Sequence, residues 1–423
     1  MNSIERKIYD IVKSQPWLKD LVRNVYQGIF DLLPRKSELL GDKFQQRDGY
    51  FFGFHDVSPF SKDDAKLLAN NASLEFKMPS PDDLLTVGYF DFANGIIGDH
   101  HILGHSSAWN FHKGCRLQWV DTNHVIYNTR VNTQLVSKKV NVVSLQEELY
   151  DFPIDTVSSS GIFATSLSYE RVECLMPGYG YIDVIDGGFI DQKAPQNTGV
   201  FLVNLTTKER TLLFSIAQLA ADIHTYPDNK DYYHYITHTS FSRDERYVSC
   251  LHRYVALDDL DKRFTRLVIY DRLTQKISYL PTEGMVSHYV WNGQSQIIAY
   301  CRIEGKECHT LFTIQEGTCT NYALQQPDIL NSDGHQSFVT DDCFITDTYP
   351  DKYRLAHIHL AHIGGNSVRI ASVYSPKAFQ TRDMYNHIAC DLHPRVSLSG
   401  KYICFDSPRS GKRALCIQQL NSL

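Results

Sequence analysis

The stretch HTSFSRDERYVSC, residues 238–250, joins a histidine to an apolar residue three positions later, a polar turn and a second apolar run. The same pattern returns in HYVWNGQSQIIAY (288–300), HQSFVTDDCFITD (335–347) and HPRVSLSGKYICF (393–405). In every copy the second apolar run lies six residues after the first apolar anchor. The anchors are Phe241, Trp291, Phe338 and Val396. The corresponding second runs are marked by Tyr247, Ile297, Phe344 and Tyr402. Four copies in one register indicate an internal structural repeat.

Two earlier segments fit the repeat more loosely. RLQWVDTNHVIYN (116–128) has Arg116 at the histidine position, and HDVSPFSKDDAKLLANN (55–71) begins at His55 with about two extra residues before its second run. The interval from Arg116 to His238 is about twice the others. It predicts one degenerate copy near GIFATSLSYERVECL (161–175).

The chain from residue 48 onward is predicted to be all-β. Short apolar runs alternate there with Gly, Asp, Asn and Ser turns, and the 25 Tyr and 22 Phe favour strands. Seven units over 48–423 average roughly 50 residues, the size of a four-stranded blade. We therefore predict a seven-bladed β-propeller over 48–423. A pair of β-sandwiches is the alternative, but sandwiches do not repeat one motif at this period.

Residues 1–47 are predicted to form an N-terminal amphipathic helical extension. Apolar residues fall at helical spacing over 4–33, with Pro16 and Pro34 ending helical stretches. The extension is expected to pack on the main domain or on a second subunit. The alternative is an interfacial membrane helix, because its lysines and arginines could face anionic lipid.

Composition narrows the class of protein and its compartment. A net charge of −6 gives no basic footprint for nucleic acid, so that partner is not expected. The ten cysteines form no CxxC pair, which is typical of a reducing compartment. No signal-peptide core and no apolar stretch of about 18 residues is present. We expect a cytoplasmic protein, with peripheral membrane or protein contact through residues 4–33 left open.

Residues at one repeat position of a propeller form a ring around its central channel. We expect such a ring to join imidazoles with one guanidinium and to meet a metal or a substrate, because imidazole is a common ligand of divalent metals. The alternative is that each residue only ties neighbouring blades together. The ring residues are His55, Arg116, His238, His288, His335 and His393.

Further candidates surround this ring. Asp333 and Asp391 each precede a ring histidine by two residues and either orient the imidazoles or cap turns. Trp109 is either a sugar-stacking platform or a buried anchor. Neither GxSxG, HExxH, a Walker A loop nor a dinucleotide fingerprint occurs, so no nucleotide cofactor is expected. The other candidates are Tyr179, Tyr181, Arg253 and Tyr349.

Two segments carry a resemblance to a known family. DGHQSFVTDDCFITDTYPD (333–351) and CDLHPRVSLSGKYICFDS (390–407) resemble the propeller family of oligogalacturonate lyases and, more distantly, propeller ulvan lyases. The resemblance covers about residues 50–423. Such enzymes cleave uronate-containing glycans by β-elimination, in which the substrate carboxylate is neutralised, a base removes the C5 proton and an acid protonates the leaving oxygen at C4.

The resemblance implies roles for the ring. A divalent metal (Mn, Ca or Zn) would lie on the axis, held by His288, His335 and His393, with Gln336 as an extra ligand. His238 would be the base, and Arg116 would pair with the carboxylate. Apart from the resemblance, we expect His55, Trp109, Arg116 and Arg253 to bind substrate. Tyr179, Tyr181 and Tyr349 would be alternative acids or bases.

Two functions follow from these observations. The first is a lyase acting in the central funnel on uronate-containing oligo- or polysaccharide, with an acidic glycan as substrate. The second is a non-catalytic propeller that binds glycan or protein in a surface-polysaccharide biosynthesis pathway.

Overall fold

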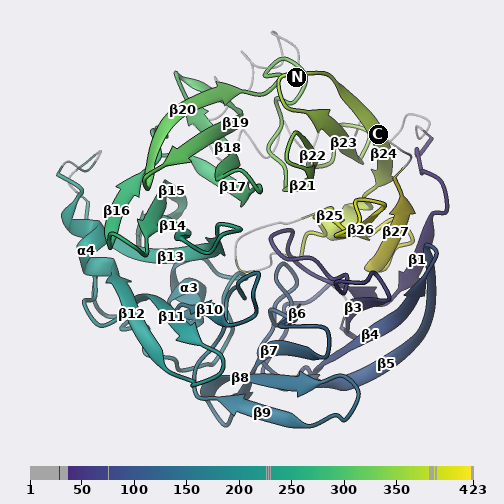
Figure 1. Cartoon of the computed structure of the whole chain (residues 1–423), viewed down its shortest axis with the longest axis horizontal. Helices are drawn as coiled ribbons and strands as arrows, with labels where there is room; N and C mark the ends of the chain where they lie inside the picture. Colours follow the sequence, from purple (N-terminus) through teal and green to yellow (C-terminus); the bar gives the residue numbers. More distant parts are fainter. Residues whose placement is uncertain are drawn as a thin grey trace.

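Seven β-sheets surround a central axis in the computed structural model of the protein (Figure 1). The structure describes residue 28 and residues 37–420, apart from 75, 225, 227, 229, 381–384, 386 and 387. The predicted all-β, seven-bladed β-propeller is confirmed. Within the described part the helices are α3 (Tyr169–Leu175), α4 (Ile216–Ala221) and the 3-10 helix η1 (Lys377–Phe379).

The first three blades follow one another along the chain. Blade 1 contains β2 (Tyr50–Phe51), β3 (Lys66–Asn71), β4 (Leu85–Ala93) and β5 (Ile96–Ser106). Blade 2 contains β6 (Gln118–Trp119), β7 (His124–Val131), β8 (Gln134–Asn141) and β9 (Glu147–Tyr150). Blade 3 contains β10 (Phe163–Ser166), β11 (Gly199–Asn204) and β12 (Arg210–Ser215).

The remaining blades complete the circle. Blade 4 contains β13 (Tyr232–Phe241), β14 (Tyr247–Ala256), β15 (Asp259–Asp271) and β16 (Lys276–Tyr279). Blade 5 contains β17 (Val286–Trp291), β18 (Gln296–Ile303), β19 (Lys306–Gln315) and β20 (Thr318–Leu324). Blade 6 contains β21 (Gln336–Thr340), β22 (Cys343–Asp347), β23 (Leu355–His362) and β24 (Ser367–Tyr374). Blade 7 contains β25 (Arg395–Val396), β26 (Tyr402–Ser407), β27 (Ala414–Gln419) and β1 (Gln45–Asp48).

The sequence repeat corresponds to the two inner strands of a blade and the turn between them. In blade 4, Phe241 ends β13 and pairs with Val248 of β14. The hydroxyl of Ser242 accepts a hydrogen bond from the Tyr247 backbone N–H at 2.9 Å and so closes the polar turn. Ser397 and Tyr402 make the same contact at 3.2 Å in blade 7. The polar residues of the repeat therefore fix the hairpin, and its second apolar run enters the core at Tyr247, Ile297 and Phe344.

The degenerate copy expected near residues 161–175 forms blade 3. Its sheet has three regular strands, and an inner segment is reduced to a bridge between Val157 and Ala164. The Asp155 N–H donates to Thr165 O at 2.8 Å, so this segment still follows β10 as an inner strand would. Helix α3, N-capped by Ser168, occupies the region beyond β10.

The N-terminal strand closes the circle. β1 pairs with β27 and forms the outer strand of blade 7, so the last blade contains both ends of the propeller (Figure 1). The expected domain boundary at residue 48 was therefore too late, because 45–48 belong to the propeller. The Asp406 carboxylate adds an inner tie by accepting the N–H groups of Phe52 and Gly53, each at 3.0 Å.

The helices predicted over 4–33 lie outside the described residues, apart from residue 28. Among the described helices, none has the length and apolar character needed to cross a membrane.

Candidate active site around the central histidines

Five of the six predicted ring residues meet around one aromatic side chain. Phe54 is 2% exposed and occupies the centre of the channel. Its ring centroid lies 4.6–5.9 Å from five imidazole centroids, which pack against one another with separations as short as 4.1 Å, between His288 and His335. The five are His55, His238, His288, His335 and His393. The five histidines thus converge as predicted, and their side chains are buried.

Local backbone strain accompanies this arrangement. Arg116, His238 and His393 have φ angles of 57°, 55° and 45°, in the left-handed region that non-glycine residues seldom adopt. The ladder between β13 and β14 shifts register between Thr237 and Ser240, so His238 lies in a bulge. Bulges change the direction of a side chain at the cost of regular pairing, and strained residues concentrate at functional sites.

Some of the ring histidines connect neighbouring blades, which is the alternative role considered for them from the sequence. The Asp347 carboxylate accepts the His393 N–H at 2.9 Å and contacts His335 Nδ1 at 2.8 Å, which joins blades 6 and 7. Burial opposes the charged form of His335, but Asp347 outweighs it and raises the pKa of this imidazole. His55 Nδ1 contacts the backbone oxygen of Gln336 at 2.8 Å. His335 and His55 therefore have clear structural roles.

His238, like His393, has one ring nitrogen without a hydrogen-bond partner. Its Nδ1 contacts Thr237 Oγ1 at 2.6 Å, whereas Nε2 is buried without a hydrogen-bond partner. Burial, followed by the nearby charges of Lys113 and Arg253, places the pKa of His238 well below its usual range. The imidazole is therefore neutral at neutral pH.

Arg253 is a buried cation without a carboxylate partner. The residue is 5% exposed, and no described carboxylate lies within ion-pair distance of its guanidinium. It donates to Ser287 O at 3.2 Å and contacts Met176 Sδ at 3.5 Å, and its Nε has no partner. Burial lowers the pKa of Arg253. Since an unpaired buried charge is costly, this position suits an anionic ligand.

Arg116 is already saturated, so the expectation that it pairs with a substrate carboxylate is not supported by its contacts. It donates from NH1 to Asp56 at 2.8 Å, from Nε to the backbone oxygen of Asp155 at 2.7 Å and from NH2 to Thr156 at 3.1 Å. The side chain of Asp155 is fully buried and accepts from the N–H of Thr239 at 2.9 Å. Burial opposes ionisation, but Arg116 and Lys113 hold the pKa of Asp155 at about 2.

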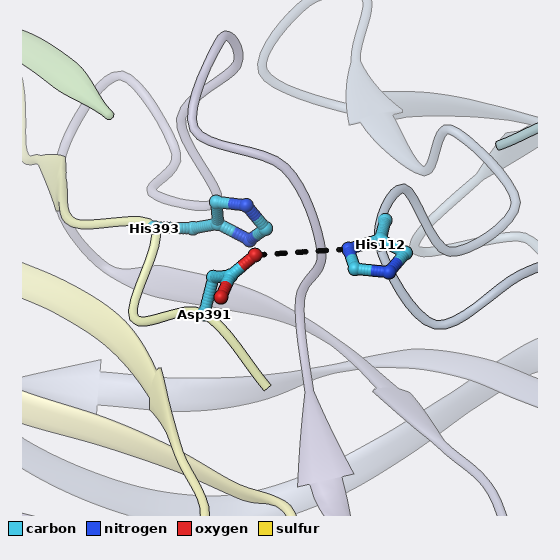
Figure 2. A group of neighbouring side chains, drawn as sticks. All are labelled: His112, Asp391 and His393. Atoms are coloured by element: carbon cyan, nitrogen blue, oxygen red, sulfur yellow. Dashed lines mark ion pairs between the residues drawn. The ribbon is translucent and has the colours of Figure 1, made fainter. Parts of the chain in front are cut away.

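A group of two histidines and an aspartate lies beside the ring (Figure 2). His112 comes from the loop between β5 and β6, and Asp391 and His393 come from the loop before β25. One ring nitrogen of each histidine and a carboxylate oxygen lie within 4.8 Å of one another, and His112 Nδ1 is 3.9 Å from Asp391 Oδ2. Burial raises the pKa of Asp391 to about 6. These donors are of the types that hold divalent transition metals.

The metal ligands implied by the resemblance fit the structure less well. Gln336 is the first residue of β21 and directly follows His335, and its side chain points away from the histidine ring. Its Nε2 lies 2.9 Å from His309 Nδ1 on β19 and donates to Gly334 O at 2.9 Å, which turns the amide toward blade 5. His288 Nδ1 is 3.3 Å from Asp333 Oδ1, so this aspartate contacts the imidazole of His288 and not that of the neighbouring His335.

The predicted aromatic candidates separate into two groups. Tyr179 stacks on His112, with centroids 4.6 Å apart and planes at 10°, and Tyr349 lies 6.0 Å from His335 by centroid distance. Both border the histidines. Tyr181 instead is 2% exposed and accepts from Asn128 at 3.2 Å. Trp109 is 4% exposed and packs in the blade 1 core, so the stacking-platform interpretation was wrong.

The other side of the channel is hollow. A cavity of about 790 Å³ opens where the inner strands end in their polar turns. Its wall contains Trp119, Phe241, Trp291 and Phe338, with Arg243 among the polar residues. None of the five ring histidines is part of this wall. The channel thus has a histidine-rich side and an aromatic side.

No protein-family model matches the sequence, and no curated protein matches it significantly. Several solved structures align with the chain at low identity. The tricorn protease aligns with a TM-score of 0.48 at 10% identity, over 92% of this chain and 34% of that chain. The β-propeller domain of the Trilobed protease from Pyrococcus furiosus gives 0.47 at 9% identity, over 88% and 98%.

A gluconolactonase from Xanthomonas campestris gives a TM-score of 0.31 at 7% identity, over 92% of this chain and 99% of that chain. The chain spans about a third of the tricorn protease. These similarities carry no inference about activity, and they give no support to the oligogalacturonate lyase family in particular. The fold assignment stands on the seven sheets themselves.

Three residues of the site were not found from the sequence. His112 and Lys113 lie in a loop that the Asn110 side chain folds by accepting both of their N–H groups, at 3.0 and 2.7 Å. Asp155 lies in the reduced inner strand of blade 3. The only available signal was the charged FHKGCR segment (111–116) directly before a repeat copy.

Proposed function

We propose that the protein is a lyase that cleaves a uronate-containing oligosaccharide by β-elimination at the histidine-rich side of the channel. The observation that carries this proposal is the unpaired guanidinium of Arg253 close to the unpartnered Nε2 of His238. A carboxylate-bearing sugar would supply the missing anion and present its C5 proton to a neutral base.

The elimination needs no oxidant or reductant. The C5–H and C4–O bonds break and a C4=C5 double bond forms. The C5 proton moves to His238 Nε2, and a tyrosine hydroxyl donates a proton to the leaving oxygen. Tyr179 is the favoured acid, because its hydroxyl lies within electrostatic range of both Asp391 and Arg253.

Substrate binding would also strengthen the base. Without substrate, the protonated form of His238 is disfavoured by its burial and by the charges of Lys113 and Arg253. A carboxylate placed against Arg253 would offset part of this positive field, so the pKa of His238 would rise when substrate binds. The site would then couple recognition of the carboxylate to proton abstraction.

The test is direct because the product absorbs ultraviolet light, since its new double bond is conjugated with the carboxylate. The full-length protein is incubated with oligogalacturonides and other oligouronides, each with Mn²⁺, Ca²⁺ or Zn²⁺. We expect absorbance to rise with the wild type, and His238→Gln and Arg253→Met to lower the rate by at least about 100-fold. Arg243→Met, on the aromatic side, is the matched control with an unchanged rate. No rise with any uronate, or an unchanged rate in His238→Gln, refutes the lyase.

A second candidate rests on the cavity of about 790 Å³. Aromatic faces beside hydroxyl groups suit a sugar chain or a peptide, so the aromatic side would serve a non-catalytic binding propeller. Binding of glycan fragments that weakens in Arg243→Met and persists in Arg253→Met would favour this function. The reverse pattern would exclude it.

A further inference from the structure

We propose that His112, Asp391 and His393 form a binding site for one divalent transition-metal ion. The site differs from the ring of repeat-position histidines, since two of its three ligands lie outside the repeat. Binding of the ion stands on this geometry alone. Its role in the elimination rests on the proposed function.

The donor set is suited to such an ion. Two imidazoles and one carboxylate are typical ligands of zinc and of other first-row metals in sites that keep positions open. Metal–ligand bonds of about 2.0–2.2 Å place neighbouring donors about 3.3 Å apart. The donors here lie within 4.8 Å, with 3.9 Å between His112 and Asp391, so side-chain shifts of about 1 Å would complete the site.

The surroundings hold these donors in place. The His112 N–H donates to Asn110 at 3.0 Å, and Tyr179 covers the imidazole by stacking. The His393 N–H donates to Asp347 at 2.9 Å, and its backbone is in the left-handed region immediately before Pro394. Fixed ligands reduce the entropy lost on binding, as outer contacts do in known metal sites.

Two further observations concern the ligands His393 and Asp391. His393 Nε2 is buried without a hydrogen-bond partner. The side chain of Asp391 is 8% exposed, and its Oδ2 lies 3.9 Å from His112 Nδ1. Buried carboxylates require a compensating charge, which a divalent cation would supply.

The ion would contribute to the proposed reaction by neutralising the substrate carboxylate, which makes the C5 proton more acidic. Tyr179 connects the metal site to the proposed reaction. Its ring stacks on His112, and the charges of Asp391 and Arg253 both act on its hydroxyl. The proposed acid therefore stacks directly on one of the metal ligands.

The test is titration of the chelator-treated full-length protein with Zn²⁺ and, separately, Mn²⁺, by calorimetry and by elemental analysis after desalting. We expect one equivalent of at least one ion. His112→Ala and Asp391→Asn should weaken its binding beyond the about 10–100-fold typical of lost outer contacts. His288→Ala is the matched control and should bind like the wild type. Circular dichroism and thermal melting confirm that each variant is folded.

Three results would overturn the site: no ion bound by the wild type, unchanged binding in both His112→Ala and Asp391→Asn, or a loss in His288→Ala as large as in His112→Ala. No sugar is present in this titration. Metal binding without lyase activity therefore overturns only the proposed function, and lyase activity in a protein that binds no ion overturns only the metal site.

Discussion

Replacing Arg253 by methionine should leave the protein at least as stable as the wild type, whereas Arg395→Met should destabilise it strongly. Both arginines are buried, at 5% and 0% exposure. Arg395 donates to Asp406 at 2.9 Å and to Gly53 O at 3.2 Å, whereas Arg253 has no carboxylate partner among the described residues. The two variants thus compare a paired and an unpaired cation under the same substitution.

The magnitudes follow from these contacts. An unpaired buried charge costs several kcal/mol, and the two weak contacts of Arg253 return about 0.5–1.5 kcal/mol each, so Arg253→Met should gain about 1–3 kcal/mol. Arg395→Met leaves Asp406 buried without its cation and should lose about 3–5 kcal/mol.

Urea denaturation with a common m-value measures both free energies of unfolding. A loss in Arg253→Met comparable to that in Arg395→Met would show that Arg253 is structural and would refute its role as an anion receptor.

Two further predictions concern the stability of the protein at acid pH and the closure of the propeller by β1. Burial holds the pKa values of His55, His238 and His252 well below those of the unfolded chain, so the unfolded state binds protons first as pH falls below about 6.5. The free energy of unfolding, measured by urea titration, should drop by up to about 1.4 kcal/mol per pH unit for each of them, and a flat profile from about pH 7 to 5 would contradict this. Deleting residues 1–48 removes β1 and should lower the melting temperature markedly, whereas deleting 1–36 keeps β1 and the closure. Equal melting temperatures for the two truncations would show that β1 does not hold the ring closed.

The repeat was sufficient to predict the propeller because each copy carries its own hairpin. An anchor such as Phe241, a serine-closed turn and a second run at Tyr247 form a local unit whose spacing is visible in the sequence. The ring of histidines followed because equivalent positions of a propeller converge on its axis. The inner strand of blade 3 was located only approximately, because its pairing is reduced to a bridge at Val157.

The chemistry of the site could not be predicted to the same extent. The unpaired state of Arg253 depends on which carboxylates surround it in space, and the sequence does not contain that information. His112 reaches Asp391 only because the loop between β5 and β6 lies next to the loop before β25 (Figure 2).

Calorimetric titration with trigalacturonate and with its carboxyl-reduced neutral counterpart tests most directly whether Arg253 receives a carboxylate. Two charge-assisted hydrogen bonds of about 1.5–3 kcal/mol each predict that the acid binds wild-type protein at least about 100-fold more tightly than the neutral trisaccharide. The preference should disappear in Arg253→Met. Equal affinities of the wild type for the two sugars would contradict the account.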